Sequence, residues 1–415
     1  MTKIPIELAI VRPYAANSRV LHTDRTFLLA SALRDDYDAN VIILASNISH
    51  PDGTRIERKD QSIIKEIAPF VKFISSTPYN RSIGIARLLS EFVYSIRLVY
   101  SLLSSKPKAL LVVEPLFFSG WICLLYGACF RVKVFADLID AWPEALAVKK
   151  ISPLKLAFPW NFIFFPLSIS RSARFLFYNR IYLVSNSYKA LLPKSVFKRV
   201  KVFYWCLGSE LDLKVNNSIS SPSILSSISQ LPDRLLTPFT LGYAGSFGAG
   251  YAINDLMIGM SRLEILFPGQ YVLHVAGSQK GFTSLSEAIK IPSNVSYKGF
   301  LNLKDMTEFY REVHSICLPY KPFSAVSMPI KFYDGLRFEK PFVSSLSLEA
   351  MSLINENRIG VCYESGCLES FVKAVFQLRS SYRSFEQAIR LFARSSDLFN
   401  SSKVYSAFAA DILAQ

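Results

Sequence analysis

The sequence has few acidic side chains and few histidines, and its cysteines form no motif typical of a metal site. Its 415 residues include 32 Asp and Glu against 47 Lys and Arg, and only 4 His. The 6 cysteines form no Cys-x-x-Cys pair and have no His at zinc-site spacing, so we interpret them as reduced core residues. The sequence therefore predicts neither a disulfide scaffold nor a metal centre.

Long apolar runs are also missing. A membrane-spanning helix needs about 20 apolar residues, whereas the run Pro115–Phe130 has 16 and the run Leu156–Ser170 has 15. We expect the first run to be a buried helix. No basic and apolar signal precedes the first expected strand, which favours a protein that stays in the cytoplasm.

The basic excess gathers around the second of these runs. Between Ala145 and Ser209 there are eleven basic residues and no acidic one. Apolar and aromatic side chains between cations are typical of a segment on an anionic membrane surface. A nucleic-acid partner would use the same charge, but no zinc-finger or RNP-type motif is present, and a merely solvated basic face remains open. The candidate membrane or acceptor residues are Lys149, Lys150, Lys155, Trp160, Phe164, Arg171 and Arg174.

Apolar residues make up 51% of the chain and charged residues 19%, which predicts heavily buried sheets. Short β-rich runs alternate with helical patterns such as His22–Arg34 and Ile83–Leu103, so the predicted class is α/β with doubly wound parallel sheets. The expected strands are Ile4–Val11, Val41–Ala45, Phe70–Ile74, Ala109–Val113, Val132–Ala136, Ile181–Ser185, Val200–Tyr204, Phe239–Ala244, Tyr271–Ala276, Val295–Lys298, Ser315–Leu318, Pro341–Ser344 and Ile359–Cys362.

The length predicts two domains of about 200 residues each. We place a Rossmann-like acceptor-binding domain at 1–208, a Ser-rich linker at 209–237 and a Rossmann-like donor-binding domain at 238–395. A last helix at 396–415 is expected to pack back toward the first domain. Ligands of such sheets bind beyond the carboxyl ends of the strands, so we expect a cleft where the two domains face each other.

The segment 329–341 carries the clearest chemistry. Ser327 is a candidate N-cap and Pro329 suits the first turn, so the helix would begin with free amides that attract phosphate. Lys331 adds a positive charge there, and Asp334 on the same face can accept from two sugar hydroxyls. These features are those of a nucleotide-diphosphate site. An ordinary amphipathic helix in which Lys331 and Asp334 pair with each other is the alternative.

Several segments in order along the chain resemble one known family, the nucleotide-sugar glycosyltransferases of the GT-B fold, of the retaining group 1 (family 4-like) kind common in bacterial polysaccharide assembly. They are Asn17-Ser-Arg-Val20, Asp137-Leu-Ile-Asp-Ala-Trp-Pro-Glu144, Gly242-Tyr-Ala-Gly-Ser-Phe-Gly248, Leu273-His-Val-Ala-Gly277, Tyr297-Lys-Gly-Phe300, Leu318-Pro-Tyr320 and Pro329-Ile-Lys-Phe-Tyr-Asp-Gly335 with Lys340-Pro341. The match runs across nearly the whole length.

The resemblance implies that Lys331 binds the diphosphate and Asp334 the ribose of the donor. It also implies that Asp140 lies on the acceptor side, so Asp140 and Lys331 are the candidate catalytic residues. The implied donor-binding set is Arg19, Gly245, Ser246, Gly248, Gly277, Gly299, Phe300, Tyr320, Ser327, Lys331 and Asp334. Tight turns for the glycines and a helix cap for Asp140 are the structural alternatives.

The sequence also departs from the family. The first glutamate of the family's glutamate pair is Val326, its His before the Asp-x-Trp-Pro-Glu motif is Ile139, and Ser246 and Phe247 stand in the region of its usual Arg and Lys. Lys331 and Arg19 would then supply most of the phosphate neutralisation.

The implied activity is retaining transfer of a hexose-type sugar without a metal or a cofactor. The sugar would pass from a nucleotide-diphosphate sugar to a lipid-linked or growing polysaccharide, such as capsule or lipopolysaccharide, at the cytoplasmic face of an anionic membrane. A sugar-nucleotide 2-epimerase of the same fold and a non-catalytic binding protein stay open.

Overall fold

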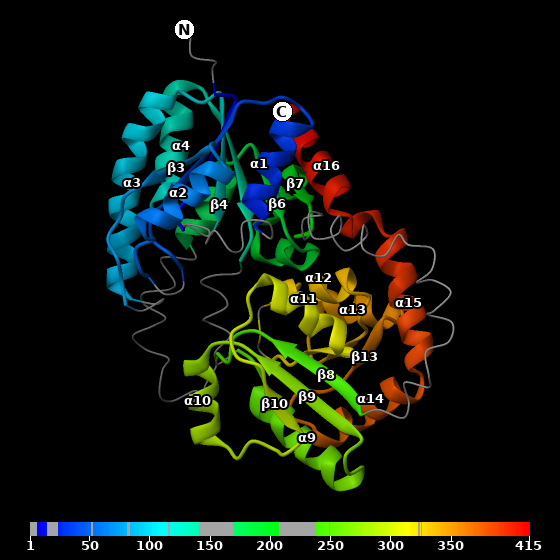
Figure 1. Cartoon of the computed structure of the whole chain (residues 1–415). Helices are drawn as coiled ribbons and strands as arrows, with labels where there is room; N and C mark the ends of the chain where they lie inside the picture. Colours follow the sequence, from blue (N-terminus) through cyan, green and yellow to red (C-terminus); the bar gives the residue numbers. More distant parts are fainter. Residues whose placement is uncertain are drawn as a thin grey trace. The chain divides into compact units, whose positions relative to one another are not determined.

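The computed structural model describes residues 6–14, 24–50, 53–80, 84–114, 117–140, 169–206, 238–248, 250–322, 324 and 326–415 (Figure 1). The strands are β1 (Leu8–Arg12), β2 (Val41–Ser46), β3 (Val71–Ile74), β4 (Ala109–Glu114), β5 (Lys133–Leu138), β6 (Arg180–Leu183), β7 (Val200–Val202), β8 (Phe239–Ala244), β9 (Tyr271–Ala276), β10 (Val295–Tyr297), β11 (Ser315–Leu318), β12 (Phe342–Ser344) and β13 (Gly360–Cys362).

The α-helices are α1 (Arg25–Asp35), α2 (Arg58–Ile67), α3 (Ile85–Ser105), α4 (Ser119–Phe130), α9 (Ile253–Leu266), α10 (Gln279–Ala288), α11 (Leu303–Glu312), α12 (Ile330–Arg337), α13 (Leu348–Glu356), α14 (Leu368–Ser380), α15 (Tyr382–Ser395) and α16 (Ser401–Leu413). Residues 169–177 are helical as well, and 3₁₀ turns cover Asn186–Leu191, Lys194–Arg199 and Asp397–Phe399.

The strands form two parallel sheets, in the orders β3-β2-β1-β4-β5-β6-β7 and β10-β9-β8-β11-β12-β13. In the first sheet Leu8 of β1 is paired with Val41 of β2 and Ala109 of β4. Right-handed crossovers put α1 and α2 on one face of this sheet and α3 and α4 on the other, since the strand order reverses after β3. The predicted class, α/β with two Rossmann-like doubly wound sheets, is confirmed.

The helix expected in the run Pro115–Phe130 differs from the prediction in its burial. The run Pro115–Phe130 forms α4 from Ser119 onward, but this helix is not fully buried, because Leu125 is 60% and Phe130 55% exposed. None of the helices in the described part of the chain combines the length and apolarity that crossing a bilayer requires.

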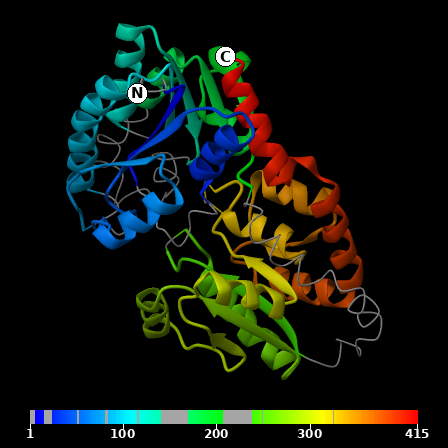
Figure 2. The ribbon, with the colours of Figure 1, turned by 45° about the horizontal axis from the view of Figure 1, so that its top comes forward.

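The chain divides into two compact units. Unit 1 comprises Met1–Cys206 and Ser401–Gln415, and unit 2 comprises Leu207–Asn400. Within unit 1 the last helix, α16, packs against α1, as Figures 1 and 2 show. Its Asp411 accepts hydrogen bonds from Arg180 (3.0 Å) and Tyr182 (3.0 Å). The expected linker 209–237 lies outside the described residues.

A buried ion pair ties β5 to the start of α1. Arg25 and Asp137 are each 1% exposed and form two hydrogen bonds, Nε to Oδ2 at 2.9 Å and Nη2 to Oδ1 at 3.0 Å. Arg25 also donates to the Tyr204 carbonyl at 2.9 Å. This pair fixes the carboxyl end of β5, from which residues 139 and 140 continue.

Replacing Asp137 by Asn should lower the free energy of unfolding by about 3 kcal/mol, because it leaves the Arg25 cation buried without a counter-charge. The matched control is Lys108→Gln, which removes an exposed pair with Glu7 at 3.8 Å and should cost less than about 1 kcal/mol. Urea unfolding followed by near-UV circular dichroism measures both. Equal costs would show that the buried pair has no special role.

Candidate functional site

The candidate site of unit 2 lies at the carboxyl edge of its sheet. The chain leaves β8 toward β9 on one side, while β11 lies on the other side of β8, so the strand order reverses between β8 and β11. Loops of open α/β sheets diverge at such a point and leave room for a ligand. The loop after β8, the loop after β11 and the start of α12 all belong to this edge.

Helix α12 begins at Ile330, and Pro329 is its N-cap without a side-chain cap hydrogen bond. The prediction that Ser327 is the N-cap is wrong, because Ser327 lies two residues before the observed cap and its side chain is fully buried. The amides of Ile330 and Lys331 have no partner inside the helix and donate to no other described residue. The helix therefore starts with the unsatisfied donors that the sequence predicts.

The Lys331 side chain folds back over the loop after β8. A Cβ placed on Gly245 would lie 2.4 Å from Lys331 Cε and 2.5 Å from its Nζ. The ammonium also lies 4.7 Å from the centre of the Tyr251 ring and 5.4 Å from that of Tyr243, with Tyr320 at 5.9 Å. Cation–π attraction holds the charge in this aromatic corner.

No described carboxylate comes within 4.0 Å of the Lys331 ammonium, so the expected alternative, a pair between Lys331 and Asp334, is wrong. Within the described ranges, aromatic faces and a glycine position the cation and no acid neutralises it.

The tyrosines around Lys331 are fixed by the backbone. Tyr243 donates through its hydroxyl to the Ser246 carbonyl. Tyr251 and Tyr320 form an antiparallel bridge, and the Tyr320 amide donates to Ser345 Oγ at 2.8 Å. The loops after β8 and β11 therefore form one framework that holds the cation in place.

Asp334 has a different partner. Its Oδ2 accepts a hydrogen bond from the Tyr310 hydroxyl at 2.9 Å. Burial raises the pKa of Asp334 from 3.8 to about 6, against the opposing effects of the Tyr310 hydrogen bond and the charges of Arg337 and Lys331. The carboxylate is therefore ionised at pH 7 but protonates in mild acid.

The remaining glycines of the predicted donor set line adjacent loops. A Cβ on Gly277 would lie 2.2 Å from the Gly245 carbonyl oxygen, and the Gly277 amide donates to the Gly299 carbonyl at 2.9 Å. Gly299 has a φ of +78°, and the following Phe300 is 74% exposed. Gly248 donates to Ser246 Oγ at 3.3 Å. The structure thus brings Gly245, Ser246, Gly248, Gly277, Gly299, Tyr320 and Lys331 together.

The predicted site residues of unit 1 do not come together in one described site. Asp140 is exposed just beyond β5. Burial, and then the charge of Asp140, raise the pKa of Tyr188. Arg171 and Arg174 are each only 2% exposed, and Arg174 binds Glu114 through Nε at 3.0 Å and Nη2 at 2.9 Å. Their predicted contact with a membrane or acceptor is wrong, because both guanidinium groups are buried. The predicted residues Arg19, Lys149, Lys150, Lys155, Trp160 and Phe164 lie outside the described residues.

A polar cluster that the sequence did not reveal lies at the carboxyl edge of the first sheet. Arg87 donates to the Tyr14 hydroxyl at 2.8 Å, and His50 Nδ1 lies 2.8 Å from the Tyr79 hydroxyl. The Tyr14 and His50 rings are 4.5 Å apart. His50 is an exposed residue, but the protein atoms around its ring desolvate it in part. This desolvation and then the Arg87 charge lower the pKa of His50 to about 4, so the ring is neutral at pH 7.

Tyr14, His50 and Tyr79 lie in the loops after β1, β2 and β3, and Arg87 lies in the first turn of α3. Only the rule that carboxyl ends of parallel strands meet at one edge could have grouped them. Across the described ranges, no three His, Cys, Asp or Glu side chains come together as a possible metal site.

No family model matches the sequence, and no curated protein matches it. Solved structures do match along nearly the whole chain. Anabaena HepE in complex with UDP and glucose is 12% identical, with a TM-score of 0.66 over 99% of this chain and 100% of that one. Sucrose-phosphate synthase from Thermosynechococcus elongatus is 13% identical, with a TM-score of 0.69 over 98% of both chains.

The apo form of the lipopolysaccharide outer core galactosyltransferase WaaB is 14% identical, with a TM-score of 0.61 over 98% of this chain and 99% of that one. Structures of UDP-GlcNAc 2-epimerases match as well, with TM-scores of 0.56 and 0.60. At these identities the likeness concerns the fold alone. The chain therefore has the GT-B fold, with two Rossmann-like sheets.

Proposed function

We propose that this protein is a retaining glycosyltransferase that uses a nucleotide-diphosphate sugar. One observation carries the proposal: the Lys331 ammonium is held over Gly245 by three tyrosine rings, and no described carboxylate lies within 4.0 Å of it. Next to it, the amides of Ile330 and Lys331 donate to no other residue that the structure describes. Together they form a cationic, donor-rich corner for a pyrophosphate.

The chemistry of sugar transfer explains this arrangement. As the anomeric bond breaks, the diphosphate leaving group gains negative charge. Fixed donors and cations stabilise that charge without having to reorganise, which is the largest catalytic term in many enzymes. Lys331 and the amides of residues 330 and 331 have this role in our proposal, with Arg19 as a further cation. Asp334 binds the ribose hydroxyls, and Phe300 and Gly299 lie beside the base.

The donor class follows from the same corner. HepE has been solved with UDP and with UDP-glucose, and the 2-epimerase of Neisseria meningitidis with UDP-GlcNAc, so a UDP-sugar is the first donor to test. Val326 cannot form the sugar contact of the family's first glutamate, because its side chain has no hydrogen-bonding atom. Specificity for the sugar would therefore depend on other loops.

On the acceptor side, Asp140 is the proposed base or orienting group. The neutral imidazole of His50, beside Tyr79 and Tyr14, offers hydrogen bonds to sugar hydroxyls. We propose a lipid-linked or growing polysaccharide as the acceptor and peripheral attachment to the cytoplasmic membrane face. The basic composition between Ala145 and Ser209 supports this location.

An epimerase is the second candidate, because UDP-GlcNAc 2-epimerases share the fold at similar TM-scores. An epimerase needs no acceptor and would convert the donor alone. A non-catalytic binding protein would bind a nucleotide diphosphate but release no sugar.

The Gly245 contact gives a sharp test with a matched control. In Gly245→Ala the new methyl carbon would lie 2.5 Å from the Lys331 ammonium nitrogen, so the lysine side chain would have to move away from the loop. Affinity for UDP should fall about tenfold or more, since a charge-assisted contact is worth about 1.5–3 kcal/mol. Gly250→Ala, in the same loop with nothing within 4 Å of its new Cβ, should retain the wild-type Kd in isothermal titration calorimetry. Equal Kd values for both variants would contradict the site.

The raised pKa of Asp334 predicts a pH dependence of nucleotide binding. As pH falls through about 6 the carboxylate protonates and loses acceptor capacity, so UDP affinity should decrease. Tyr310→Phe removes a hydrogen bond that lowers this pKa, so the midpoint should move to higher pH. Titration calorimetry from pH 5 to about 8 measures both; an unmoved midpoint would exclude Asp334 as the titrating group.

Folding stability should show the opposite sign. A carboxyl group whose pKa is raised in the folded state favours folding while it is protonated, and this stability is lost as pH rises through about 6. Asp334→Asn keeps the acceptor for Tyr310 without the charge, so at pH 8 it should raise the free energy of unfolding by about 1–3 kcal/mol. Thermal melts of this variant that are no higher than those of the wild type would contradict the buried-charge interpretation.

Activity separates the candidate functions. The donor that gives the largest melting shift among UDP-, GDP-, ADP- and dTDP-sugars is incubated alone and then with a lipid extract of the source cells. We expect label transfer only with the extract, and a loss of about 100-fold in Lys331→Ala but not in Lys290→Ala. Isomerised donor in the first incubation would establish the epimerase instead.

A further inference from the structure

Helix α3 of unit 1 exposes apolar side chains to solvent although its inner side is already packed. Its buried residues are Ser90, Glu91, Tyr94, Ser95, Leu98, Ser101 and Leu102. Its exposed residues form an apolar stripe of Ile85, Leu89, Phe92, Ile96, Tyr100 and Leu103, each between 44% and 85% exposed. Their spacings of three and four residues put them on one face of the helix.

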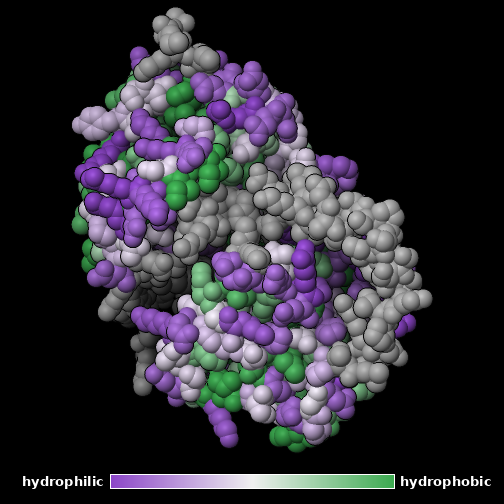
Figure 3. Space-filling model, viewed as in Figure 1, coloured by the Kyte–Doolittle hydropathy of each residue, from purple (hydrophilic) through white to green (hydrophobic). Residues whose placement is uncertain are grey.

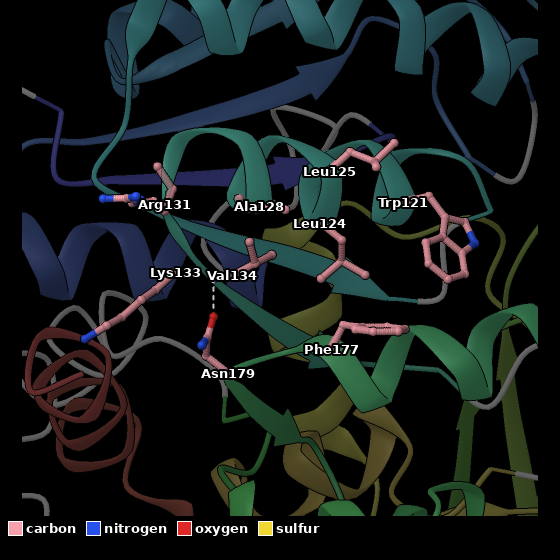
Figure 4. A pocket seen from close by; sticks show the side chains of 11 residues that line it. Trp121, Leu124, Leu125, Ala128, Arg131, Lys133, Val134, Phe177 and Asn179 are labelled. Carbon is pink, nitrogen blue, oxygen red and sulfur yellow. Dashed lines mark hydrogen bonds between the residues drawn. The ribbon is translucent and has the colours of Figure 1, made fainter.

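The apolar surface continues beyond α3. Helix α4 packs beside α3 and exposes Leu125 and Phe130, and the helix at 169–177 exposes Phe177, which is 63% exposed. A groove of about 500 Å³ runs between these last two helices. Figure 4 shows Trp121 and Phe177 at its one end, with Leu124 between them, and Arg131 and Lys133 at the other. Figure 3 shows apolar residues reaching the surface of unit 1 among hydrophilic ones.

The charges on this surface have one sign. From residue 84 to the end of β5, the described acidic residues are Glu91, Glu114 and Asp137, all at most 7% exposed. Glu91 accepts from the Phe118 amide at 2.9 Å, and Glu114 and Asp137 bind Arg174 and Arg25. The exposed cations of the same stretch are Arg97, Lys106, Lys108, Arg131 and Lys133. Of these, Lys108 lies 3.8 Å from Glu7.

We propose that the face formed by α3, α4 and the helix at 169–177 binds directly to an anionic lipid bilayer, with the α3 stripe inserted below the headgroups. Large exposed apolar patches mark interaction sites, and apolar side chains together with exposed cations match the interfacial region of an anionic leaflet. The inference deepens the proposed function, because it names the surface that would bring the enzyme to a lipid-linked acceptor. It replaces Arg171 and Arg174, which are buried, as the membrane contact.

Vesicle flotation of the full chain tests this proposal. We expect binding to vesicles that contain phosphatidylglycerol, weaker binding at high ionic strength, and little binding to pure phosphatidylcholine. Leu89→Gln combined with Tyr100→Gln should reduce the bound fraction at least about tenfold, and so should Arg131→Glu combined with Lys133→Glu.

Matched controls come from unit 2. Ile258→Gln with Ile265→Gln replaces two side chains on α9 that are 53% and 69% exposed, and Lys290→Glu with Lys373→Glu matches the charge change. Both controls should bind vesicles like the wild type. Loss of binding in the controls, or wild-type binding in both unit 1 variants, would overturn the proposal.

Two further readouts keep the outcomes distinct. The Kd for UDP should stay unchanged in every variant. A failure of vesicle binding would therefore leave the nucleotide site untouched, and a failure of UDP binding would leave the membrane proposal untouched. In sedimentation velocity the wild type should be monomeric. A dimer that dissociates in the Leu89→Gln and Tyr100→Gln variant would show that a second copy, not a membrane, covers this face.

Discussion

The close approach of the Lys331 ammonium to the Gly245 backbone is the contact on which the candidate site depends. It needs a glycine after β8, a helix that starts after β11, and aromatic rings that direct the charge. The strand order places the glycine loop next to the start of this helix, because β8 and β11 are neighbours while the chain connects them through β9 and β10. A cation held by rings rather than by an acid keeps its charge for a ligand.

The site also has a cost in stability. The Asp334 carboxyl group is buried enough for its pKa to rise to about 6. Two buried acids of unit 1 differ from Asp334, because Glu114 and Asp137 are each bound by an arginine through two hydrogen bonds. Among the described residues, the Asp334 carboxylate has only the Tyr310 hydroxyl as its hydrogen-bond partner. A carboxyl group whose pKa is raised by burial in this way is typical of a binding site.

The sequence predicted the strands well because the strands of a parallel sheet are short apolar runs, and Phe239–Ala244, Tyr271–Ala276 and Ser315–Leu318 match the structure residue for residue. It predicted Lys331 beside free amides, but it could not show that Tyr310 rather than Lys331 binds Asp334, since that contact joins two helices. The outward stripe of α3 was equally hidden. Apolar periodicity gives the face of a helix but not whether that face is covered.

A crystal structure with UDP would show directly whether Lys331 binds the donor. We expect the pyrophosphate within hydrogen-bonding distance of Lys331 Nζ and of the amides of residues 330 and 331, with the ribose hydroxyls on Asp334. A nucleotide bound elsewhere, with the Lys331 ammonium still enclosed by Tyr243, Tyr251 and Tyr320, would contradict this expectation.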